Sequence, residues 1–208
     1  MALLSRRPGR WLRGLPWLLL RLGRAGGGRA VGTLSVWVWY ERFTLRLWHV
    51  QPIRPNGMLL MSRSRHHGHP VRLADGALIR SGDPIIELHI DNTYTGELLA
   101  TGRITPWRVL RTMNADMQTL AERVAAGEFA DACALHAVSL FADAAQRFGM
   151  EFRRLPRTPY WRLVRYFMVG LLVLHHPAGW ERVAHLREST WPGEIWMSRA
   201  TLLSRVQR

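Results

Sequence analysis

The chain has 208 residues and a formal net charge of +14, and all of its 29 Lys and Arg residues are arginine. This length suits one hydrophobic core. The absence of lysine excludes Schiff-base enzymes, biotin or lipoate carriers and P-loop sites that need the phosphate-binding lysine. The single cysteine, Cys133, excludes an intrachain disulfide and a zinc site built from several cysteines of one chain, and it fits a reducing cytoplasm.

Residues 1–30 are predicted to form a basic N-terminal arm, flexible or interfacial, ahead of a single domain over 31–208. The arm holds seven arginines and no acidic residue, which is half of the net charge. Its uncharged run, Leu15 to Leu20, is too short for a secretory signal, and no stretch of the chain supplies the roughly 20 apolar residues of a spanning helix. The composition of the arm leaves three interpretations open. The arm binds anionic lipid, it binds nucleic-acid phosphate, or it has no partner. The predicted surface-binding residues are Arg6, Arg7, Arg10, Trp11, Arg13, Trp17, Arg21 and Arg24.

The first elements of the domain are predicted to be a helix and a group of short strands. From Val36 to Val50 apolar residues recur at spacings of three and four, which is typical of a helix, although the content of 34–40 suits a strand equally well. Asp75-Gly76 then predicts a two-residue hairpin with a type I′ turn. The strands expected around it are 58–63, 71–74, 77–80 and 85–90, joined as an antiparallel meander.

Helices dominate the second half of the prediction. Thr105 and Pro106 have the residue types of an N-cap and a first helical position. The expected elements are helices over 106–126, 129–148 and 159–174, strands over 150–155 and 194–198, and a short helix from 200. In the second of these helices, Cys133 and His136 lie on the apolar face and are expected in the core. The order predicts an α+β fold, a small antiparallel β-meander packed with three to five helices.

Several segments resemble a known family. The stretch LADGALIRSGDPIIELHIDN at Leu73–Asn92, together with the Trp-rich helix predicted before it and the late EIWMSR at Glu194–Arg199, is similar to the small YkoP-like domain of Firmicutes. The likeness extends over about residues 34 to 208. It implies a domain found alone or beside polysaccharide deacetylase domains, and hence a cell-envelope context. The metal-binding Asp-Asp pair and the His-x-x-x-His pattern of the deacetylase itself are absent from this sequence.

Three polar residues form the strongest candidate for chemistry. Glu87, His89 and Asp91 alternate along one predicted strand, so their side chains would share a face. Two carboxylates and an imidazole could perform acid–base catalysis, and His89 with Asp91 could hold a divalent metal ion. The alternative is the solvated face of an antiparallel sheet. The histidines of the loop at 66–69 match no zinc signature.

The sequence favours a non-catalytic accessory or binding domain, peripheral to the membrane and linked to cell-envelope polysaccharide metabolism. Its expected location is the cytoplasm, at the inner face of the membrane, and its expected partners are an anionic membrane surface and an envelope polysaccharide or its processing enzyme. No cofactor is predicted apart from the divalent metal. The alternatives are a metal-dependent hydrolase centred on Glu87, His89 and Asp91, and an arginine-rich protein that binds nucleic acid.

Overall fold

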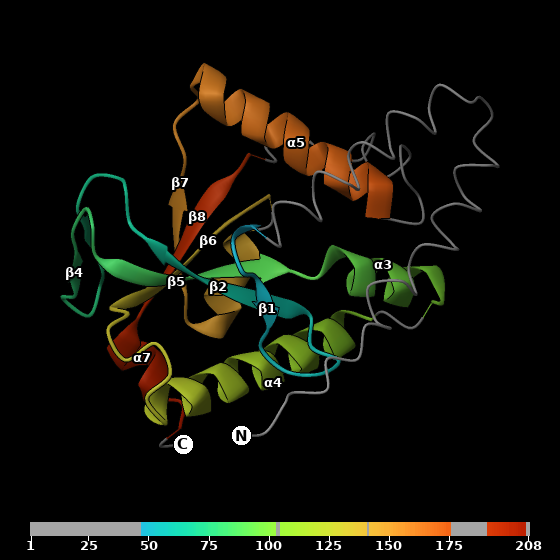
Figure 1. Ribbon diagram of the computed structural model, residues 1–208. Coiled ribbons are helices and arrows are strands. Elements are labelled where there is room, and N and C mark those ends of the chain that lie inside the picture. Colours follow the sequence, from blue (N-terminus) through green and yellow to red (C-terminus); the bar gives the residue numbers. More distant parts are fainter. Residues whose placement is uncertain (1–46, 103–104, 141, 176–190, 207–208) are drawn as a thin grey trace.

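A computed structural model describes residues 47–102, 105–140, 142–175 and 191–206 (Figure 1). Its centre is a six-stranded sheet in the order β1-β2-β5-β6-β8-β7. β5 and β6 run parallel, and the other neighbouring pairs are antiparallel. The strands in this order are β1 (Gln51–Pro52), β2 (Leu59–Arg65), β5 (Pro84–Ile90), β6 (Ala134–Ser139), β8 (Gly193–Ser198) and β7 (Glu151–Arg154). The α+β class is confirmed.

The predicted meander is wrong in its connections. β2 pairs directly with β5, while β3 (Val71–Arg72) and β4 (Leu78–Ile79) form a separate two-stranded sheet. The hairpin turn at Asp75-Gly76 is present, but of these two residues only Gly76 has a positive φ, 88°. A type I′ turn needs positive φ at both positions. The turn instead closes with the Gly76 N–H donating to the Leu73 carbonyl at 3.0 Å.

The predicted helix over 129–148 is also wrong. This segment forms β6 followed by a 3-10 helix, η1 (Ala142–Phe148). Its apolar spacings of three and four fit a helix by coincidence. In the strand, Leu135 and Ala137 face the main core and Ala134 faces the opposite side. The strand forms because β6 pairs with β5 on one side and β8 on the other. Such tertiary pairing commonly overrides local propensity.

Four α-helices accompany the sheet in the described ranges. They are α3 (Asn92–Ala100), which was not predicted, α4 (Pro106–Ala125), α5 (Pro159–His175) and α7 (Arg199–Leu203). Thr105 caps α4 as predicted, since its hydroxyl accepts from the Arg108 N–H at 3.1 Å. The arm at 1–30 and most of the predicted helix from Val36 lie outside the described residues. Nowhere in the described ranges is a helix both long and apolar enough to cross a membrane.

The two faces of the sheet are covered differently. α4 supplies the main core, where Met117, Leu120 and Val124 pack against strand residues such as Met61 and Ile86. The β3–β4 hairpin covers part of the other face, and its Ile79 packs in a second cluster with Ile85, Ala134 and Trp196. In Figure 1, α4 runs below the strands and α5 above them. The rest of this second face is available to polar side chains.

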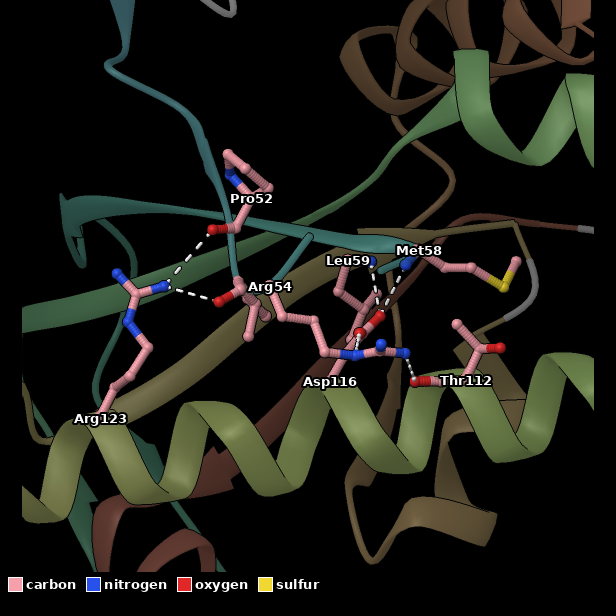
Figure 2. A network of polar contacts seen from close by, with 8 residues as sticks. Pro52, Arg54, Met58, Leu59, Thr112, Asp116 and Arg123 are labelled. Carbon is pink, nitrogen blue, oxygen red and sulfur yellow. Dashed lines mark hydrogen bonds and ion pairs between the residues drawn. The ribbon is translucent and has the colours of Figure 1, made fainter. Parts of the chain in front are cut away.

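A buried carboxylate ties α4 to the turn between β1 and β2 (Figure 2). Asp116, which is fully buried, accepts from the N–H groups of Met58 and Leu59 at 2.7 and 2.9 Å and pairs with Arg54 Nε at 2.5 Å. Burial raises the pKa of Asp116, and the two N–H donors and Arg54 oppose that effect. A Cβ at Gly57 would overlap the Asp116 carboxylate, so the turn needs glycine there. The contacts of Asp116 are internal, which assigns it a structural role.

Candidate functional site

The second face of the sheet carries a row of polar residues from neighbouring strands. In β5, Ile86 and Leu88 enter the main core, so Glu87 and His89 point to the opposite face. The register sets Glu87 beside Ser62 of β2 and beside His136 of β6, and His136 beside Trp196 of β8. We define the sheet-face cluster as Ser62, Glu87, His89, His136 and Glu194.

His136 lies at the centre of the sheet-face cluster. Its Nδ1 is 4.0 Å from Glu87 Oε1, and its Nε2 is 3.8 Å from Glu194 Oε1. The imidazole packs on Trp196 with 4.3 Å between the ring centroids, and the Trp196 indole N–H donates to Glu194 at 3.3 Å. The His136 side chain is 14% exposed, against 34% for Glu87 and 25% for Glu194. The carboxylates are therefore reachable from solvent, while the imidazole between them is largely covered.

The environment sets the charge of these groups. The pKa of Glu194 is below its ordinary value, first because of His136 beside it and then because Trp196 donates to it, with burial working in the opposite direction. Glu194 is therefore ionised at neutral pH. Burial lowers the pKa of His89, the charge of His136 lowers it further and Glu87 opposes both. His89 is thus held neutral, with its Nε2 in a hydrogen bond to the Ser62 hydroxyl at 3.2 Å.

We expect the depressed pKa of His89 to make stability depend on pH. Below the ordinary pKa of about 6.5, the unfolded chain binds a proton on His89 more readily than the folded protein does. This contribution to stability is complete above about pH 6.5 and is lost as the pH falls from there through the lower pKa that His89 has in the folded protein. Urea unfolding at about pH 7.5 and about pH 5.5 should show a smaller loss of stability for His89→Gln than for wild type. The exposed His67→Gln is the control. Equal losses in wild type and His89→Gln would contradict this explanation.

The structure keeps only two of the three predicted site residues together. Glu87 and His89 share a face of β5 as the alternation predicts. Asp91 lies beyond the strand and caps α3, where its Oδ1 accepts from the Tyr94 N–H at 2.8 Å. In the structure His136 of β6 lies beside Glu87, and Glu194 of β8 lies at the other ring nitrogen of His136. Neither residue was predicted as part of the site, because the apolar spacing of 129–148 indicated a helix for His136 and no pattern in the sequence marked Glu194.

The arrangement suits ligands and protons better than a preformed metal site. In the part of the chain that the structure describes, no three His, Cys, Asp or Glu side chains are grouped as metal ligands. The reason is visible at His136, whose two ring nitrogens face different carboxylates. Both separations, 4.0 and 3.8 Å, are longer than a hydrogen bond, so an exchange of protons between this imidazole and either carboxylate needs one intervening water or ligand group. The predicted surface-binding arginines and tryptophans of the arm lie outside the described residues.

In the histidine loop at 66–69, the first histidine, His66, has a structural role. His66 is buried, and its Nε2 is hydrogen-bonded to the carbonyl of His69 at 2.8 Å. Its ring meets Trp196 edge-on, 5.2 Å between centroids. His66 and His136 therefore pack on the same indole, and His66 supports the sheet-face cluster from the hairpin side.

Comparison with known proteins gives one result. A family model of the YkoP domain matches residues 31–206. No curated protein and no solved structure matches the chain.

Proposed function

This chain belongs to the YkoP domain family, and we propose that it is a binding domain, peripheral to the membrane, with an accessory role in cell-envelope polysaccharide metabolism. The binding function is supported by the position of His136 between two partly exposed carboxylates, Glu87 and Glu194. The envelope context comes from the family resemblance. The chain would act at the inner face of the membrane.

The sheet-face cluster is rich in hydrogen-bond acceptors. The ion pairs of Glu87 and Glu194 both go to His136, so within the described residues no arginine neutralises either carboxylate. This is unusual in a chain with 29 arginines. Ionised carboxylates only accept hydrogen bonds, and a ligand with several hydroxyl or N–H donors matches them. Saccharides carry many such donors, so we assign a saccharide as the ligand of the sheet-face cluster.

Substitution of the two carboxylates tests the binding site. Glu87→Gln and Glu194→Gln should each weaken binding of soluble N-acetylglucosamine oligomers about tenfold or more, because a hydrogen bond to a charged group contributes about 1.5–3 kcal/mol. Calorimetric titration of the full chain measures this. Glu122→Gln, an exposed carboxylate on α4, is the matched control and should bind as wild type does. Failure of the wild-type chain to bind the oligomers would contradict the saccharide assignment.

A second candidate function is hydrolysis, with the sheet-face cluster as the active site. It is favoured by the contacts of His136, since a carboxylate at each ring nitrogen is an arrangement that can move protons. The prediction is release of reducing ends from the same oligomers by wild type and at least a hundredfold slower release by His136→Gln. Loss of this activity with a chelator would support a metal-dependent version. Binding without any turnover would leave the accessory function.

A further inference from the structure

α5 presents an apolar outer face that the described residues of the domain leave uncovered. None of its residues from 159 to 172 is fully buried, and neither hydrophobic core cluster includes a described residue of α5. Tyr160, Leu163 and Tyr166 are 64%, 68% and 67% exposed. Their spacing of three residues places them together on one side of the helix. A helix with this composition normally buries such a face.

The surroundings of this face are strongly basic. From Phe152 to His175 the sequence contains no acidic residue, while it contains Arg153, Arg154, Arg157, Arg162 and Arg165. Arg162 is exposed and lies within the same arc of the helix as Tyr166. Arg157, just before α5, lies over the Trp191 ring at 5.6 Å. The exposed side chains of α5 thus combine tyrosine and leucine with arginine.

We propose that the face formed by Tyr160, Arg162, Leu163 and Tyr166 docks on an anionic lipid bilayer, with α5 lying in the plane of the headgroups. Apolar and aromatic side chains enter the boundary between headgroups and acyl chains, and arginine meets the lipid phosphates. Charge complementarity selects this occupant, because the segment is basic throughout and the whole chain carries +14. The inference rests on the membrane-peripheral part of the proposed function and locates it on the folded domain, separate from the basic arm.

The test is partition of the full chain between buffer and vesicles of phosphatidylglycerol and phosphatidylcholine. Leu163→Gln with Tyr166→Gln should lower the partition coefficient at least tenfold, because both side chains lose their apolar contact with lipid. Arg162→Gln should lower it about fivefold, the effect of one basic residue near an anionic surface. These residues are exposed, so the fold should be retained. Trp107→Gln, at an equally exposed aromatic on α4, is the control and should bind as wild type does.

A full-length arm variant separates the inference from the proposed function. It replaces Arg6, Arg7, Arg10 and Arg13 by glutamine. Loss of binding in the α5 variants with the arm unchanged supports the inference. Normal binding by the α5 variants together with loss in the arm variant overturns it and keeps the membrane-peripheral function. No binding of wild type to anionic vesicles overturns both. Dimerisation of wild type that the α5 variants abolish, with vesicle binding unaffected, would overturn it in favour of a second copy of the chain.

Discussion

Replacement of Asp116 by alanine should lower the free energy of unfolding by about 3–5 kcal/mol. The side chain is fully buried and joins α4 to the turn after β1 through two backbone N–H groups and Arg54 (Figure 2). Removing it leaves these two N–H groups without their acceptor, and leaves a guanidinium that is only 26% exposed without its counter-charge. A buried donor without a partner costs its full desolvation free energy. Urea denaturation of the two proteins measures the difference.

Two further variants show whether the carboxylate itself is responsible. Asp116→Asn keeps the shape and one acceptor oxygen, so its loss of stability should be smaller than that of Asp116→Ala. Glu122→Ala, on the exposed side of the same helix, should change stability by no more than about 0.5 kcal/mol. If Asp116→Ala behaved like Glu122→Ala, the Asp116 contacts would not hold α4 to the sheet.

Trp196→Ala should be comparably destabilising, by about 3–5 kcal/mol. Trp196 has no exposed surface and lies in the second core cluster, between the β3–β4 hairpin and the sheet. Its ring also contacts both His66 and His136. The substitution would open a cavity in the hairpin core and remove the surface on which His136 rests. We therefore expect lower stability and weaker ligand binding at the sheet-face cluster.

The matched control is the same substitution at an exposed site. Trp107 is 74% exposed at the start of α4, and Trp107→Ala should change stability by no more than about 0.5 kcal/mol. Both variants lose one indole, so the difference between them reports what the buried position of Trp196 and its contacts contribute. Equal and small effects would show that the second core cluster contributes little.

The sequence predicted correctly those elements that are determined by neighbouring residues, such as helix caps and tight turns. α4 begins and ends where its residues specify, with the Thr105 cap and with Gly127 at a φ of 98° after its last turn. The turn at Gly76 is local in the same sense. β6 was missed because its stability comes from β5 and β8, which lie about 50 and 60 residues away along the chain. The pairing of distant strands is not encoded in a spacing of three or four.

The residues of the candidate site also fall into two groups, those predicted from the local sequence and those that depend on the order of the strands. Alternation within β5 was enough to place Glu87 and His89 on one face. The addition of His136 and Glu194 depended on strand order, since they come from β6 and β8. Asp91 was lost because the strand ends at Ile90 and the next residue caps a helix. Recognition of the Asp91 cap would have required the helix at 92–100, which the sequence analysis did not predict.

The most direct test of membrane attachment through the folded domain is side-chain footprinting of the full chain by hydroxyl radicals, with and without anionic vesicles. Tyr160 and Tyr166 on α5 should be protected when vesicles are present, and Trp107 on α4 should be modified to the same extent in both samples. If Tyr160 and Tyr166 of the vesicle-bound protein were modified as freely as in solution, attachment to the membrane through α5 would be contradicted.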